Sequence, residues 1–144
     1  MAAIEIRPFV PEKTSRATWD SYHEVRRIRC DEYDPTEPLA PDAVVEGRMR
    51  HRDPDEDEHH VLALVDGRVV GYSGYAAAAG GSRAYKTNRP FIWTWGGVIE
   101  PFRRKGIGRA LLMPLLGYAE GRGARTLDFW TSEADGFGFL EHHG

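Results

Sequence analysis

The fold is decided by one stretch, Val98-Ile99-Glu100-Pro101-Phe102-Arg103-Arg104-Lys105-Gly106-Ile107-Gly108-Arg109-Ala110-Leu111-Leu112. Aromatic and β-branched residues from Phe91 to Ile99 predict a strand that enters it. A helix is expected to begin near Gly106 and to run to about Tyr118 or Glu120. Its apolar residues recur at helical spacing: Ile107, Leu111, Leu115 and Tyr118. Pro114 predicts a kink or an early end, because proline removes a main-chain hydrogen bond.

This strand, turn and helix suit a bound diphosphate. The first turn of a helix has unpaired N–H groups and a partial positive charge. Gly106 and Gly108 allow the main chain to approach a ligand closely. Positive potential is added by four side chains: Arg103, Arg104, Lys105 and Arg109. The stretch therefore predicts an anion-binding site.

Other common motifs fit the sequence less well. No P-loop string, G-x-x-x-x-G-K-[ST], occurs in the chain. The dinucleotide fingerprint G-x-G-x-x-G fails, because Leu111 stands where its third glycine belongs. The segment Gly71-Tyr72-Ser73-Gly74 is no nucleophile elbow, since its second glycine comes one residue too early.

The turn resembles the Q/R-x-x-G-x-G/A element of the Gcn5-related N-acetyltransferase (GNAT) superfamily, with Arg103, Gly106 and Gly108 in the defined places. Val98 and Arg103 also match the family's V-x-P-x-x-R pattern. Glu100 stands where the proline of that pattern usually falls, and Pro101 follows one place later.

Two further segments carry the resemblance. The segment from Phe139 to Gly144 is similar to the F-Y-E-x-x-G end of a later helix in the family. A hairpin from Val61 to Ala76, with Asp66-Gly67 at its turn, is similar to the family's second and third strands. The resemblance covers about residues 3–144.

The resemblance implies a single GNAT-like domain over residues 1–144 with an α/β (α+β) acyl-CoA N-acyltransferase fold. Its central sheet is expected to be mixed and mostly antiparallel, with helices on both faces. Acetyl-CoA, the implied cosubstrate, would lie between two strands that part, Phe91–Ile99 and Thr126–Thr131. Main-chain groups of Val98 and Ile99 would pair with the pantetheine arm. The pyrophosphate would be held by the amides of Arg104, Lys105, Gly106, Ile107, Gly108 and Arg109.

The implied reaction is direct attack of a primary amine, from a small molecule or a peptide, on the thioester. A base or a water chain must take the proton of the amine. Glu100 and Glu133 are the candidates for this role, and Asp128 is a further one. Each of these carboxylates also suits a plain surface position.

Departures from the family pattern keep a second hypothesis open. Leu140 stands where the family often has a tyrosine that protonates the leaving thiolate, and Glu133 stands where an asparagine is common. The chain ends at Gly144, where relatives usually continue with a phenylalanine and two more strands. The expectation is a domain that lacks its C-terminal strands and is completed by a second GNAT domain, as the N-terminal half of a tandem protein, or by a homodimer partner. The alternative function is a non-catalytic CoA-binding or scaffolding half of such a protein.

The remaining sequence predicts an edge strand at Ile4–Val10, ended by Pro8, and a helix capped by Thr14 or Ser15 that runs to about Tyr33. A second helix is expected from Ala43 to His51. The later predictions are a charged loop at Arg52–Glu58, strands at Val61–Val65, Arg68–Ala76 and Thr126–Thr131, a flexible connection at Ala77–Asn88, and a last helix within Ser132–His143.

Composition places limits on the function. The chain has 144 residues, a formal net charge of −3 and one cysteine, Cys30. The charge argues against binding to a nucleic-acid backbone, and a lone cysteine suits a reducing cytoplasm. No run of about 18 apolar residues predicts a membrane span. No metal is expected, because neighbouring histidines such as His59 and His60 point apart on a strand.

Aromatic residues next to the predicted site are expected mainly in the core. Trp93 and Trp95 share one side of their strand. Packing in the core is the favoured interpretation for both, and lining of an acceptor pocket is the alternative. Tyr72 and Tyr75 are expected on opposite faces of the sheet. Cys30 is expected to behave as a small, mostly buried hydrophobic residue.

Overall fold

The computed structural model describes residues 3–83, 85–88, 90–129 and 138–141. A five-stranded sheet runs through it in the order β1-β2-β3-β4-β5. The strands are β1 (Ile4–Pro8), β2 (Glu56–Val65), β3 (Arg68–Ala78), β4 (Phe91–Val98) and β5 (Thr126–Asp128). The helices are α1 (Arg16–Tyr33), α2 (Asp42–Arg50), α3 (Tyr85–Asn88) and α4 (Ile107–Arg122), with 3-10 turns η1 (Pro11–Lys13) and η2 (Glu100–Phe102). Residues 138–141 are also helical.

The sheet is mixed, as the sequence predicts. Neighbouring strands from β1 to β4 are antiparallel, and β5 alone runs parallel to its neighbour β4. The β2–β3 hairpin turns at Asp66-Gly67, where both residues have positive φ, 51° and 78°. Glycine and aspartate tolerate this backbone region in a tight hairpin turn. The strand β1 lies at the edge, which agrees with Pro8 as its last residue.

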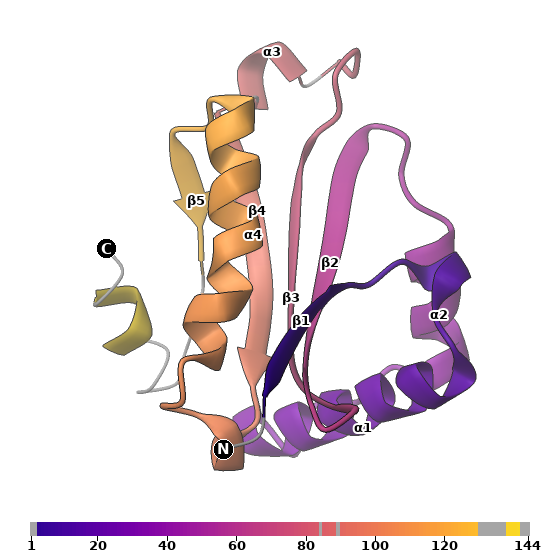
Figure 1. Cartoon of the computed structure of the whole chain (residues 1–144). Helices are drawn as coiled ribbons and strands as arrows, with labels where there is room; N and C mark the ends of the chain where they lie inside the picture. Colours follow the sequence, from indigo (N-terminus) through magenta and orange to yellow (C-terminus); the bar gives the residue numbers. More distant parts are fainter. Residues whose placement is uncertain (1–2, 84, 89, 130–137, 142–144) are drawn as a thin grey trace.

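Helices lie on both faces of the sheet. Successive side chains of a strand point to opposite faces. On β3, the ring of Tyr72 contacts Tyr22 of α1, with ring centroids 5.5 Å apart. A side chain at the preceding residue, Gly71, would instead meet Leu111 of α4. The helix α4 therefore covers one face, and α1 packs on the other (Figure 1).

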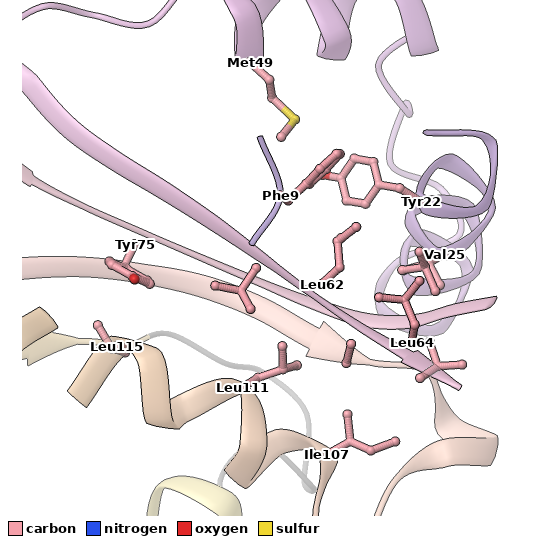
Figure 2. Packing of buried hydrophobic residues seen from close by; sticks show 14 of the residues in the cluster. Phe9, Tyr22, Val25, Met49, Leu62, Leu64, Tyr75, Ile107, Leu111 and Leu115 are labelled. Atoms are coloured by element: carbon pink, nitrogen blue, oxygen red, sulfur yellow. The ribbon is translucent and has the colours of Figure 1, made fainter. Parts of the chain in front are cut away.

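The hydrophobic core is divided between these two faces, as Figure 2 shows. On the face of α4, the stripe of that helix packs on the sheet through Ile107, Leu111 and Leu115, each at most 4% exposed. Tyr118, expected in the same stripe, is partly buried, and Ala119 completes the buried set. On the opposite face, Phe9 packs against Trp19 and Tyr22 of α1, together with Leu62, Val25 and Met49.

A partly buried polar network joins α1 to α2. Glu46 of α2 accepts hydrogen bonds from Arg16 of α1 and contacts the Nε2 atom of His23, each at 2.8 Å. The Arg16 hydrogen bonds are the main reason that the pKa of Glu46 falls to about 2, and His23 adds to the effect. Ser15 caps α1, because its hydroxyl oxygen accepts from Thr18 N. Of the two predicted caps, Ser15 is thus the one used.

Several predicted boundaries differ from the structure. Of the two outcomes predicted at Pro114, a kink or an early end, the early end is wrong, since α4 continues to Arg122 and is capped by Gly123 with φ of 70°. The strand β2 already begins at Glu56, inside the predicted charged loop. Part of the predicted connection is structured, because β3 extends to Ala78 and α3 follows. The predicted strand to Thr131 and helix from Ser132 fall partly outside the described residues, of which 138–141 are helical.

Candidate diphosphate-binding site

The predicted diphosphate turn connects β4 to α4. After Val98 the chain forms the 3-10 turn η2, then Arg104 adopts φ of 62° and Gly106 adopts φ of 84°. Helix α4 begins at the next residue, Ile107, with Gly106 as its N-cap and no side-chain cap. Two left-handed residues in three reverse the chain, so that consecutive N–H groups can converge on one side of the turn, as in anion-binding nests.

The main-chain amides of this turn have no hydrogen-bond acceptor within the part of the chain that the structure describes. The first hydrogen bond of the helix leads from Ala110 N to Gly106 O, at 3.0 Å. No hydrogen bond leads from the N–H groups of residues 104–109 to another residue that the structure describes. Arg104, Lys105 and Arg109 are exposed beside them. The turn thus presents unpaired donors and three cationic side chains at the positive end of a helix.

The two glycines are required for different reasons. A Cβ at Gly106 would meet nothing within 4 Å, but its φ of 84° is a strained conformation for any other residue. At Gly108 the backbone is ordinary, and a Cβ would lie 3.1 Å from the ring of Phe139. Gly108 therefore allows the helical segment 138–141 to pack against the first turn of α4.

A carboxylate of α1 fixes the approach to the turn. Glu32 Oε1 accepts from Arg103 at 2.9 Å and from Arg29 at 3.3 Å, while Glu32 Oε2 accepts from the N–H of Glu100 at 2.7 Å. The side chains of Glu32, Arg103 and Arg29 are all less than 20% exposed, at 15%, 17% and 13%. This cluster ties the end of α1 to η2 and thereby positions the residues that follow.

The hydrogen-bonding roles of three residues at this site differ: Arg103, Ile99 and Val98. The guanidinium of Arg103 donates to Val98 O at 2.8 Å as well as to Glu32, so it acts within the protein and positions the turn. The N–H of Ile99 donates to Val70 O at 3.0 Å, and its carbonyl accepts from Phe102 N. Because adjacent N–H groups of a strand point in opposite directions, the N–H of Val98 points away from β3. Of these residues, Val98 therefore offers a main-chain donor toward β5.

The strands β4 and β5 pair over only part of their length. Their parallel register runs from Phe91↔Thr126 to Trp93↔Asp128, although β4 continues to Val98. The hydroxyl of Thr94 donates to Asp128 O at 2.7 Å, just beyond the last pair. From residue 94 onward, no described strand pairs with this edge of β4. The open edge leads directly to the turn before α4.

Two of the candidate catalytic residues lie in the described part of the chain. Glu100 is exposed and begins η2, and Asp128 is exposed at the end of β5. Glu133 lies outside the described residues. Leu140 is half-buried in the helical segment that contacts Gly108 through Phe139. Its side chain has no proton to donate.

The favoured interpretation of Trp93 and Trp95 as core residues is wrong. Both are exposed, at 38% and 39%. They lie on the face of the sheet packed by α1, because their partners on β3 are Ala76 and Gly74, which share a face with Tyr72. The indole of Trp95 covers Gly74, where any Cβ would overlap it. The glycine at position 74 is the sequence signal that another side chain packs closely on β3. The sequence does not show that this side chain is Trp95.

Polar partners of the neighbouring strand were also missed by the sequence interpretation. His60 of β2 contacts the ring of Trp95, with centroids 5.6 Å apart, and its Nε2 lies 3.2 Å from Glu58 Oε2. Burial lowers the pKa of His60 even though Glu58 acts to raise it. The expected divergence of the two histidines is confirmed, because His59 stacks on Tyr75 on the opposite face.

Comparisons with known proteins identify the family and the fold. A profile of the Acetyltransferase (GNAT) family matches residues 22–142. The chain belongs to this family. A search of curated protein sequences returned no match. Among the described residues of this GNAT chain, no cluster of three or more potential metal ligands occurs, and no helix has the length and apolarity needed to cross a membrane.

Solved structures with the same fold include a tandem GNAT protein from the clavulanic acid biosynthesis pathway. It is 21% identical with a TM-score of 0.71, and the match covers 87% of this chain and 35% of that one. The GNAT chain thus spans about a third of that relative. An aminoglycoside acetyltransferase from an uncultured soil metagenomic sample, in complex with sisomicin, is 11% identical with a TM-score of 0.69, covering 97% and 85% of the two chains. An aminoglycoside N-acetyltransferase in complex with CoA is 15% identical with a TM-score of 0.64, covering 99% and 86%. These likenesses confirm the predicted fold class.

Proposed function

We propose that this chain is an N-acetyltransferase that moves an acetyl group from acetyl-CoA to a primary amine of a small molecule or peptide. The observation that carries the proposal is the turn at residues 104–109, where the open edge of β4 meets α4. Its main-chain donors are unpaired among the described residues. Family membership and a relative in complex with CoA support the cosubstrate. Relatives that act on aminoglycosides support a small-molecule amine.

In this proposal the amides of residues 104–109 bind the pyrophosphate, with Arg104, Lys105 and Arg109 adding positive charge. The N–H of Val98 pairs with the pantetheine arm along the open edge of β4. Ile99 contributes through its position, since its own main-chain groups are used inside the protein. Bound there, acetyl-CoA supplies an activated acetyl thioester next to β5.

Proton transfer completes the proposed reaction. A carboxylate near the open edge takes a proton from the attacking nitrogen, and Glu100, Glu133 and Asp128 are the candidates. Glu100 is exposed at the beginning of η2, and Asp128 is exposed at the end of the β4–β5 pairing. Single Glu→Gln or Asp→Asn variants distinguish the candidates. Turnover is measured for each variant, and its CoA affinity is measured as the control.

The test of cosubstrate binding is calorimetry with CoA. Gly106→Glu should abolish binding, because it adds negative charge and a strained φ at the turn. The matched control is Gly117→Glu, on the exposed side of the same helix, where a Cβ meets nothing within 4 Å. Equal CoA affinity in both variants would overturn the site. Thiol release from acetyl-CoA with a panel of amines then tests the transfer itself.

Two observations favour a second function, a non-catalytic CoA-binding half of a tandem protein. Leu140 cannot protonate a leaving thiolate, and the chain spans 35% of the tandem GNAT relative. In that case CoA binds tightly and no amine yields product. Leu140→Tyr supplies the missing acid at the position suggested by the resemblance, so activity gained only in this variant would identify the second function.

The remaining expectations follow from the enzyme proposal. The protein acts in the cytoplasm, where acetyl-CoA is available, and uses no metal. Its assembly partner is a second GNAT domain of the same polypeptide or a second copy of the chain.

A further inference from the structure

One row of residues crosses the face of the sheet packed by α1 and brings two carboxylates beside an exposed indole. Glu58 of β2 pairs with Ala76 of β3, Ala76 pairs with Trp93 of β4, and Trp93 pairs with Asp128 of β5. Residues directly paired across a sheet share a face. We name these four residues the tryptophan row.

The two carboxylates and the indole of the row are accessible to a ligand. The side chain of Glu58 is 24% exposed, Trp93 is 38% exposed, and Asp128 is exposed. Between Glu58 and Trp93 the row contains only Ala76, whose methyl side chain is 5% exposed because neighbouring groups cover it. Phe91 and Trp95, on either side of Trp93 on the same strand face, are also exposed. Aromatic faces of this kind attract cations as well as apolar groups.

The spacing of the row sets the size of its ligand. Strands lie about 4.8 Å apart, so Glu58 and Trp93 are separated by about 10 Å and Glu58 and Asp128 by about 14 Å along the row. The two carboxylates are too far apart to bind one ammonium group together. They suit two cationic groups on one molecule, with its carbon chain or ring lying on the indole of Trp93.

The two ends of the row are not equivalent. Asp128 is the last residue of β5 that pairs with β4, next to the open edge. Glu58 lies on β2, two strands away from this edge of β4, and its Oε2 is 3.2 Å from the Nε2 of His60. The His60 ring is in turn held between Phe9 and Trp95. Glu58 is thus fixed by its neighbours at the far end, while Asp128 lies beside the position of the thioester in the proposed function.

From this geometry we propose that the acceptor is a polycationic amine bound along the tryptophan row, with its reacting nitrogen at Asp128 and a second cationic group at Glu58. The proposal rests on the proposed acetyl transfer and specifies its substrate class. The ammonium group gives one proton to Asp128, and the neutral nitrogen then forms a bond with the thioester carbon. The C–S bond breaks, the second proton leaves the nitrogen, and the CoA thiolate takes up one proton to become a thiol. One proton is released to solvent in each turnover.

The test compares a polyamine with a monoamine on the intact chain. Thiol release is measured with spermidine and with butylamine, which share a primary amine but differ in the second cation. We expect Glu58→Gln to raise KM for spermidine about tenfold, leaving kcat and the butylamine reaction unchanged. Asp128→Asn should lower kcat for both amines. Glu120→Gln, an exposed carboxylate change at the far end of α4, is the control and should change neither.

A binding measurement separates failure of this proposal from failure of the proposed function. In the CoA-bound protein, spermidine should shift the indole N–H resonances of Trp93 and Trp95, assigned with Trp93→Phe and Trp95→Phe, whether or not product forms. An equal KM for spermidine in wild type and Glu58→Gln, or unshifted indole resonances, overturns the polycation proposal while CoA binding stands. Loss of CoA binding itself counts against the proposed function instead.

Discussion

Glu32 is the side chain whose removal tests how the diphosphate turn is held in place. It accepts hydrogen bonds from Arg103, Arg29 and the N–H of Glu100, and it is 15% exposed. A hydrogen bond to a charged group contributes about 1.5–3 kcal/mol, and loss of a buried partner can cost about 3–5 kcal/mol. Because the cluster is only partly buried, we expect Glu32→Ala to lower the free energy of unfolding by about 2–3 kcal/mol.

The assay is urea denaturation followed by intrinsic fluorescence, with CoA calorimetry on the same samples. Glu24→Ala is the matched control on the same helix, because the Glu24 carboxylate is 55% exposed and lies 3.8 Å from Arg68. A surface change of this kind should cost less than about 0.5 kcal/mol. Glu32→Ala should also weaken CoA binding, since η2 and Arg103 lose their anchor. If both variants unfold at the same urea concentration and bind CoA equally, the positioning role of Glu32 is refuted.

Three further predictions concern other parts of the structure. Arg16 holds the pKa of Glu46 near 2, below the unfolded value of 4.5. The ionised Glu46 therefore stabilises the fold fully above pH 4.5, and this stabilisation is lost as pH falls toward 2. In Glu46→Gln, the free energy of unfolding measured across that range should depend less on pH. Gly106→Ala should lower the free energy of unfolding by about 1 kcal/mol through strain at positive φ, measured by denaturation, and an unchanged midpoint would contradict this. Tyr118→Phe removes a 2.6 Å hydrogen bond to Asp57 and should cost about 1 kcal/mol, while absorbance titration of the wild type should show a phenol with a pKa raised to about 12 by burial and by Asp57.

The sequence predicts the fold well where one local signal dominates. Asp66-Gly67 fixes the hairpin turn, and the apolar spacing of α4 identifies the buried face of that helix. The early end expected at Pro114 fails because the packed stripe of α4 holds both halves of the helix against the sheet, which outweighs one missing hydrogen bond. The residues of β2 and β3 that lie beyond the predicted strand ends are strand because the two strands pair there. The sequence of one strand alone does not show this pairing.

The candidate site shows the same division. The glycine-bearing turn can be predicted from the sequence because all its functional residues lie within one short segment. The anchor at Glu32 cannot be predicted in this way, because it joins α1 to a turn 68 residues farther along the chain. Trp93 looks like a core residue in sequence, since aromatic residues usually fill sheets. Its exposure follows from where α1 lies across the sheet, and that placement is a property of the folded chain.

The central claim is that the main-chain amides of residues 104–109 bind a diphosphate. The direct measurement is a titration of the ¹⁵N-labelled chain with CoA and, separately, with pantetheine, which lacks the diphosphate. If these amides bind the diphosphate, CoA shifts the amide resonances of this turn to saturation, and pantetheine leaves them in place. Saturable CoA binding with these six amides unshifted would contradict this claim.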